Sequence, residues 1–176
     1  MATREIWHEI LINVSPSAVY EAVTDAKKLA HWWTTGARGE SAIGKHLEFW
    51  FGEFRAAEME VTVLKPHELV RWHVTPKVAS DWVDTEVEFK IFRVNEQTVL
   101  HFRHSNWHED AKMFPHCSLG WAIFLLSLKE FVETEPSLSD EWLQDLHLWS
   151  VAGRPHASSL DHHKNVLDDV FRGSTC

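Results

Sequence analysis

The sequence predicts an α+β fold in which a curved antiparallel β-sheet grips one long α-helix. The helix is predicted at residues 116–134, where apolar side chains recur at steps of three and four. The sheet is predicted from five segments between residues 45 and 105, in which apolar and polar side chains alternate. Because each element has one apolar face, sheet and helix are expected to bury those faces against each other.

The N-terminal part of this pattern is a strand followed by two short helices. Residues 5–14 alternate as a strand with its isoleucines on the inner face. Ser15 and Pro16 then supply an N-cap and a first-turn proline, which predicts a short helix. A second short helix is expected at residues 26–33. Residues 34–44 contain three glycines and no periodicity, so we expect a loop there.

The five strand-like segments are separated by turn-forming residues, and their alternation indicates one dry face and one solvated face. Their glutamates fall on the face expected to be solvated, which favours a solubilising surface over a catalytic pair; these are Glu58, Glu60, Glu86 and Glu88. Asn95 suits a turn residue with a positive φ. The segments are residues 45–51, 56–64, 68–74, 83–94 and 98–105.

The residue pattern changes after the predicted long helix. We expect residues 1–134 to form the domain of sheet and helix, and residues 135–176 to form a helical C-terminal extension. Trp142, Leu146 and Trp149 make a narrow apolar stripe in that extension. A lone helix would leave this stripe exposed, so it should pack on the domain or on a second subunit, and we predict a homodimer.

Composition excludes several classes of partner. The net charge of −9 and the lack of a basic stripe disfavour nucleic acid. No apolar run approaches the roughly 20 residues that span a bilayer, so no membrane segment is expected. The first ten residues are charged and lack the apolar core of a signal peptide, which favours a cytoplasmic location.

The sequence also lacks the usual signatures of metal and nucleotide chemistry. The two cysteines suggest neither a disulfide framework nor a zinc site. His101 and His104 cluster with other histidines, but their spacing directs them to opposite faces of a strand, so no metal site is expected. There is no phosphate-binding glycine loop, dinucleotide fingerprint or nucleophile elbow, so we expect no cofactor and assign no catalytic residue.

Several segments resemble the homologues of the activator of the heat-shock protein 90 ATPase. This family is a branch of the helix-grip superfamily of START, SRPBCC and birch-pollen-allergen-like proteins. The similarity covers about residues 5 to 133. Asn106 stands where the family often has glycine, and asparagine also tolerates the left-handed backbone. The segments that carry the resemblance are Val19–Asp25, Leu29–Trp33, Pro66 with Glu68–Trp72, His104–Trp107 and Leu119–Trp121.

The resemblance implies a helix-grip fold that encloses a cavity between the sheet and the long helix. In many relatives that cavity binds hydrophobic small molecules, so our first hypothesis is a protein that binds a hydrophobic or aromatic ligand. One alternative is an enzyme of the cyclase or dehydratase type that uses a pocket histidine. Another is a chaperone-associated or other protein-interaction module, although eukaryotic activators carry a further N-terminal domain.

The pocket candidates are the inward-facing residues of the predicted sheet and helix, with two tryptophans at the expected entrance. Most of them also suit an ordinary core. His104 is expected to be the polar group of the pocket that contacts the ligand. The alternative is a core histidine whose hydrogen bonds stay within the protein. The candidates are His8, Ile10, Trp32, Trp33, Met59, Val61, Trp72, Phe89, Phe102, His104, Trp121, Phe124 and Leu125.

Overall fold

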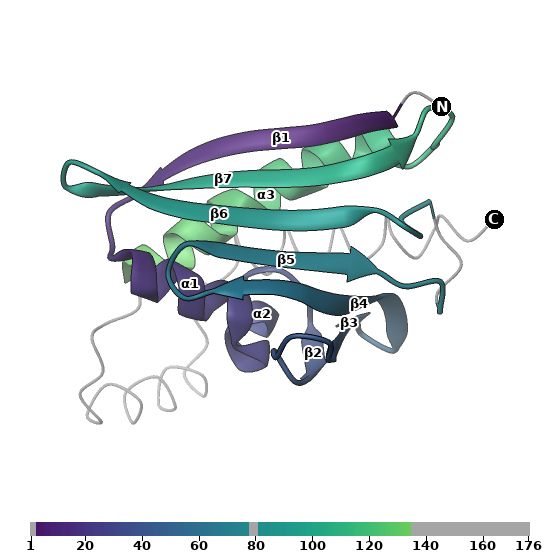
Figure 1. Ribbon diagram of the computed structural model, residues 1–176, viewed down its shortest axis with the longest axis horizontal. Coiled ribbons are helices and arrows are strands. Elements are labelled where there is room, and N and C mark those ends of the chain that lie inside the picture. The colour runs from purple at the N-terminus through teal and green to yellow at the C-terminus, as the bar shows by residue number, and fades with distance from the viewer. Residues whose placement is uncertain (1–2, 78–80, 135–176) are drawn as a thin grey trace, which may run out of the picture. The chain divides into compact units, whose positions relative to one another are not determined.

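The structure is a computed structural model that describes residues 3–77 and 81–134 (Figure 1). Its elements follow the predicted order of strand, two short helices, sheet and long helix. The extension predicted at 135–176 lies outside the described residues, and the domain boundary after residue 134 stays a prediction. The elements are β1 (Thr3–Ile12), α1 (Pro16–Thr24), α2 (Ala26–Trp32), β2 (Gly36–Gly39), β3 (His46–Phe51), β4 (Phe54–Lys65), β5 (Leu69–Val74), β6 (Glu86–Val94), β7 (Gln97–His108) and α3 (Phe114–Thr134).

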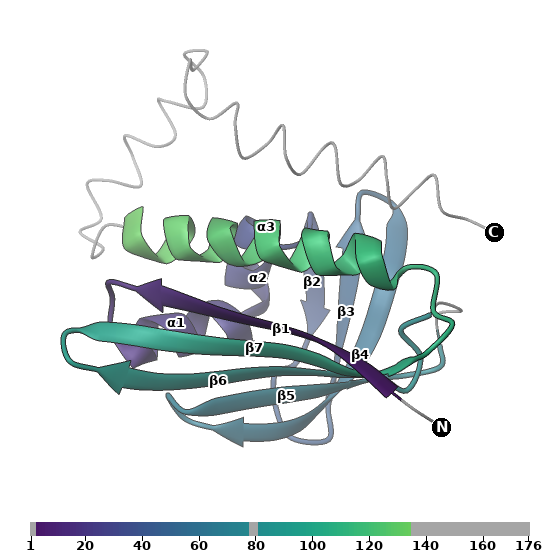
Figure 2. The same cartoon turned by 90° about the horizontal axis from the view of Figure 1, so that it is seen from above.

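The sheet has seven antiparallel strands in the order β1-β7-β6-β5-β4-β3-β2. The first strand therefore pairs with the last, and Ile6 lies opposite His104 in that pairing. The long helix α3 runs along one face of the sheet (Figure 2). These features confirm the predicted α+β helix-grip fold. No helix in the described part of the chain is long and apolar enough to cross a membrane.

The two short helices begin where the sequence predicts. Ser15 caps α1 by accepting a hydrogen bond from the backbone N–H of Ala18, and Pro16 occupies the first turn. Asp25 ends α1 and caps α2, where its carboxylate accepts from the backbone N–H groups of Lys27 and Lys28. One residue thus serves both helix ends, and the chain turns sharply between them.

The predicted loop at residues 34–44 is partly wrong, because it contains the short edge strand β2. Gly39 pairs with Leu47 of β3 at a φ of 116°. A Cβ on Gly39 would lie only 2.1 Å from the carbonyl oxygen of His46. Glycine is therefore needed for close pairing here. Glycine has no side chain, so Gly36 and Gly39 interrupt the alternation of apolar and polar side chains from which a strand is predicted.

The expectation that Glu58 is solvated is also wrong. Its side chain on β4 is only 3% exposed and lies 2.7 Å from Nζ of Lys77, measured to Oε1. Arg55 lies 3.6 Å from the other carboxylate oxygen, and the hydroxyl of Thr75 donates to Oε1. The segment after β5 covers this carboxylate, which strand alternation does not reveal. Glu60, Glu86 and Glu88 are half-buried.

Candidate functional site

Aromatic rings fill the space between the sheet and α3. Trp33, at the C-terminal end of α2, lies with its ring centroid 4.8 Å from that of Trp121 on α3. Trp121 is 4.4 Å from Phe102 of β7, which in turn is 5.4 Å from Phe89 of β6. Trp72 of β5 is 5.1 Å from Phe89. These contacts form a continuous cluster, called here the aromatic cluster and defined by Trp33, Trp72, Phe89, Phe102 and Trp121.

The structure places the predicted pocket residues on the inner side of the domain. Ile10 and His8 are half-buried, and His8 lies 3.3 Å from the carbonyl oxygen of Ser118. Trp32 points toward the helix pair, where its indole N–H donates to the carbonyl of Ala22. The fully buried candidates are Trp32, Trp33, Met59, Val61, Trp72, Phe89, Phe102, His104, Trp121, Phe124 and Leu125.

His104 is held by hydrogen bonds at both ring nitrogens. The indole N–H of Trp121 reaches Nδ1 at 3.0 Å, and an indole can only donate, so Nδ1 must accept. The proton then sits on Nε2, which lies 2.8 Å from Oγ1 of Thr85. That hydroxyl in turn donates to the carbonyl of Trp82. The chain of bonds fixes one tautomer and leaves neither nitrogen available.

Burial keeps this imidazole neutral. His104 has no exposed surface, and desolvation lowers its pKa from 6.5 to about 3. The neighbouring Cys117 accepts a hydrogen bond from the indole N–H of Trp82. Burial raises the pKa of this thiol to about 12, so it stays protonated at neutral pH. Neither group is poised to exchange protons with a substrate.

Two of the fully buried tryptophans have an indole N–H without an acceptor among the residues that the structure describes, and the half-buried Trp50 has a third such N–H. The two are Trp72 in the aromatic cluster and Trp107 at the far end of β7. Both side chains are fully buried. A buried donor without a partner costs about 1 to 3 kcal/mol, so each N–H favours an acceptor atom nearby.

Sequence reasoning missed three residues of this interior. Thr85 and Trp82 complete the hydrogen-bond chain of His104, and the ring of Trp107 lies 4.5 Å from the imidazole. Trp107 could have been found from the sequence, because it is the last residue of His104–Trp107, one of the segments that carry the family resemblance. Thr85 precedes β6 by one residue, so its inward direction followed from the alternation of that strand.

Comparison with protein families gives one match over most of the domain. A model of the family described as "Activator of Hsp90 ATPase homolog 1-like protein" matches residues 13–133. A search of curated proteins returned no match.

Solved structures from several bacteria share the fold. The solution structure of the Aha1 dimer from Colwellia psychrerythraea is 36% identical, with a TM-score of 0.69, covering 76% of this chain and 99% of that one. Protein MLL2253 from Mesorhizobium loti is 17% identical, with a TM-score of 0.68, covering 75% and 98%. CalU16 from Micromonospora echinospora is 20% identical, with a TM-score of 0.61, covering 81% of each chain. The last two similarities concern the fold alone.

Proposed function

Because the chain belongs to the family of Activator of Hsp90 ATPase homolog 1-like proteins, we propose that it binds a hydrophobic or aromatic small molecule between its sheet and α3. Helix-grip proteins generally bind hydrophobic ligands or act as cyclase-like proteins. The aromatic cluster supplies an apolar wall suited to a flat ligand, since ring pairs gain about 0.5 to 1.5 kcal/mol beyond the area that they bury.

The observation that carries this proposal is the buried indole N–H of Trp72 without an acceptor. A ligand with a carbonyl, phenol or carboxylate oxygen would satisfy it. Trp72 lies within the aromatic cluster, with its ring 6.1 Å from that of Trp33 and parallel to within 5°. One donor among apolar walls is the usual composition of a small-molecule site, where the polar group fixes the orientation of the ligand.

Entry of a ligand requires rings to move, because the cluster is closely packed. Trp33 is the side chain best placed to do so. It follows the last residue of α2, and its ring lies 4.4 Å from that of Phe49 on β3, near the edge of the sheet. Rotation of this ring out of the cluster would open a path beside β2. Trp33 was also expected at the entrance from the sequence.

Native mass spectrometry on freshly purified protein tests the proposal first, because a co-purified ligand adds a discrete mass. A thermal-shift screen of aromatic and lipid-like compounds then supplies ligands for titration. Trp72→Phe keeps the ring and removes the N–H, so it should weaken the best oxygen-bearing ligand about tenfold, or 1.4 kcal/mol.

Trp50→Phe is the matched control for this experiment. Trp50 also has a buried N–H without an acceptor in the described residues, but its half-buried ring lies beside Arg38 and not in the aromatic cluster. Its loss should leave the affinity unchanged. Equal affinity of the wild type and the folded Trp72→Phe variant would remove the main support for the proposal.

The enzymatic alternative has less support from the interior. An acid or base needs a titratable group that reaches the substrate. His104 is neutral near pH 7 and both of its nitrogens are bonded within the protein, which favours the structural role. We therefore infer ligand binding without assigning a catalytic residue.

We also propose that the chain forms a homodimer. The relative from Colwellia psychrerythraea, at 36% identity, is described as a dimer. On α3, Leu119 and Leu126 are 63% and 60% exposed and lie two helical turns apart on the same face. A second copy would cover this apolar face. Association with a chaperone and a cytoplasmic location remain predictions.

Light scattering tests the dimer. The wild type should have twice the mass of one chain, and Leu119→Glu with Leu126→Glu should halve it. Leu11→Glu is the control, because Leu11 is 47% exposed on β1 and not on α3. A monomeric wild type, or a double variant that stays dimeric, would contradict this proposal.

A further inference from the structure

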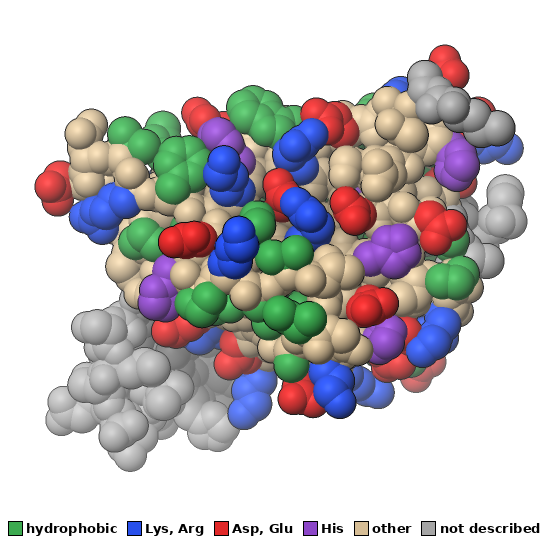
Figure 3. Space-filling view, in the orientation of Figure 1, with side chains coloured by type: hydrophobic (Ala, Val, Ile, Leu, Met, Phe, Trp, Pro, Cys, Tyr) green, Lys and Arg blue, Asp and Glu red, His purple; other side chains and the backbone are tan. Residues whose placement is uncertain are grey.

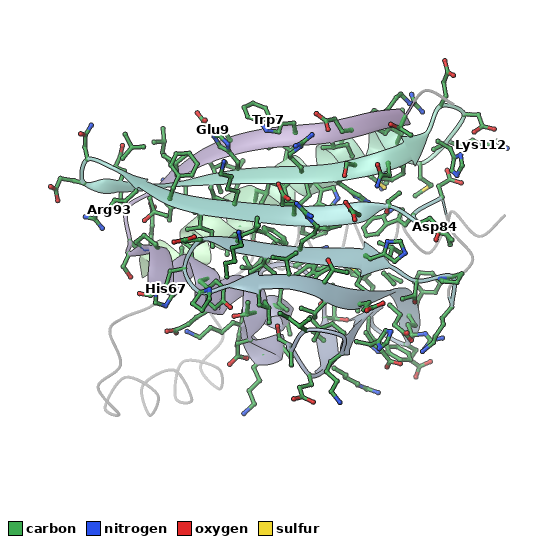
Figure 4. The ribbon with its side chains drawn as sticks, viewed as in Figure 1. Trp7, Glu9, His67, Asp84, Arg93 and Lys112 are labelled. Carbon is green, nitrogen blue, oxygen red and sulfur yellow. The ribbon has the colours of Figure 1, made fainter. Side chains whose placement is uncertain are left out.

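A groove with a volume of about 700 Å³ lies outside the interior, at one end of the sheet. Its walls come from the start of α1, the turn between β4 and β5, and the last residues of β6. Figure 4 shows His67 and Arg93, two of its lining residues, at the same end of the sheet. This volume falls within the range of about 300 to 1,000 Å³ typical of small-molecule sites.

The groove joins apolar surface to an excess of positive charge, because three cationic residues and one carboxylate, that of Glu68, line it. Leu69, Phe92 and Pro16 contribute half-buried apolar side chains. Lys65 and Lys90 lie beside them, and Lys90 is opposite Leu69 in the pairing of β5 with β6. Neither lysine has a carboxylate partner among the described residues. Arg93 adds a third cation, paired with the exposed Glu96.

A second hollow, on the outer face of the sheet, serves as a comparison. Two of its three cations pair with carboxylates, Arg71 with Glu88 and Arg103 with Glu5. The third, Arg4, donates to the backbone carbonyls of His108 and Ala111. Figure 3 shows acidic and basic side chains mixed over this face of the sheet. Of these two hollows, the groove is the one lined by lysines without a carboxylate partner among the described residues, in a chain whose net charge is −9.

The turn that forms one wall is held in an unusual conformation. His67 has a φ of 64°, where glycine is the ordinary choice, and the backbone N–H of Glu68 bonds to the carbonyl of Lys65 across the turn. The imidazole packs edge-on against Tyr20 of α1, with ring centroids 5.6 Å apart. This contact links the turn to the helix and fixes the width of the groove.

We propose that this groove binds a small organic anion with an apolar body, such as an aromatic carboxylate or sulfonate. The apolar body would lie against Leu69 and Phe92, and the anionic group would reach Lys65 and Lys90. Charge-assisted hydrogen bonds to the two ammonium groups supply the selectivity for an anion. The site is separate from the aromatic cluster and does not depend on ligand binding there.

Two fluorescent probes test the groove. 8-Anilino-1-naphthalenesulfonate carries the anion, and N-phenyl-1-naphthylamine is the same framework without it. The sulfonate should bind the wild type more tightly than the neutral probe, and added salt should weaken it, because salt screens exposed charges. Lys65→Gln with Lys90→Gln should weaken the sulfonate about tenfold and leave the neutral probe unchanged.

Lys112→Gln is the matched control, since this exposed lysine lies at the opposite end of the sheet from Arg93 (Figure 4). It should bind the sulfonate as the wild type does. Amide shifts on sulfonate binding should map to residues 65–69 and 90–93. Unchanged sulfonate affinity in the double variant, shifts confined to the aromatic cluster, or no binding by the wild type would overturn the groove site. Shifts confined to the aromatic cluster would at the same time support the interior proposal, which Trp72→Phe tests separately.

Discussion

The indole N–H of Trp121 on α3 donates to Nδ1 of His104 on β7 across 3.0 Å, so a fully buried hydrogen bond joins the long helix to the sheet. His104→Leu removes this acceptor and also the partner of Thr85. The buried N–H of Trp121 then lacks a partner, while the hydroxyl of Thr85 keeps its bond to the carbonyl of Trp82, and the free energy of unfolding should fall by about 2 kcal/mol. Urea denaturation measures the loss.

His101→Leu is the control for this substitution. His101 is on the same strand, but it faces outward and bonds to Glu9 near the solvent. Exposed pairs contribute about 0.2 to 1 kcal/mol, so the loss should be small. Similar losses in the two variants would show that the bonds of His104 do not hold the core together.

The lowered pKa of His104 makes stability depend on pH. The unfolded imidazole titrates near 6.5 and the folded one near 3, so between these values only the unfolded chain takes up the proton. The stabilisation is complete above the unfolded pKa and is lost as pH falls, by about 1.4 kcal/mol per pH unit. Urea denaturation at several pH values between about 7.5 and 5 gives the free energy of unfolding at each pH. This free energy should fall less steeply with falling pH for His104→Leu than for the wild type. Parallel slopes would contradict the assignment.

Glu58→Gln should destabilise the domain although Glu58 is on the outward side of β4. The carboxylate is buried, and its loss removes the partner of Lys77 and one of the two carboxylates beside Arg55, the other being Glu48. We expect the free energy of unfolding to fall by about 2 kcal/mol. Glu60→Gln, two residues along the same strand and half-buried, should change it by less than about 0.5 kcal/mol. Equal effects would mean that the cations do not depend on Glu58.

Gly39→Ala tests the close pairing of β2 with β3. The added methyl group meets the carbonyl oxygen of His46, and the φ of 116° disfavours any side chain. The free energy of unfolding should fall by about 2 kcal/mol. Gly36→Ala is the control in the same strand, since its nearest contact is Cβ of Trp50 at an ordinary 3.8 Å. A neutral Gly39→Ala would show that the edge strand is not required for stability.

Much of the fold was predictable because hydrophobic periodicity and capping residues act locally. Pro115 lies in the first turn of α3 as expected, although the helix begins two residues before the predicted start. Asn95 and Asn106 adopt positive φ values of 54° and 65°. Both follow from the tolerance of asparagine for the left-handed backbone, which needs no knowledge of tertiary contacts.

The parts that sequence reasoning missed depend on contacts between distant segments. Alternation correctly directs Glu58 away from the core, but only the folded chain brings Lys77 over it. Similarly, periodicity places His104 inside without revealing that Trp121 and Thr85 would take both nitrogens. Partners of this kind are set by strand register and helix rotation, which hydrophobic pattern determines only approximately.

The pairing of β1 with β7 has a consequence for the order of folding. Glu5 and Arg103 form an ion pair although 98 residues separate them in the chain. Strands β3 to β7 are joined by neighbouring antiparallel pairs, so they can form while loops are still short. Strand β1 leaves the ribosome before β7 and must wait for it, with its isoleucine face uncovered. A nascent chain that stalls before residue 97 therefore exposes an unpaired edge and an apolar surface to its neighbours.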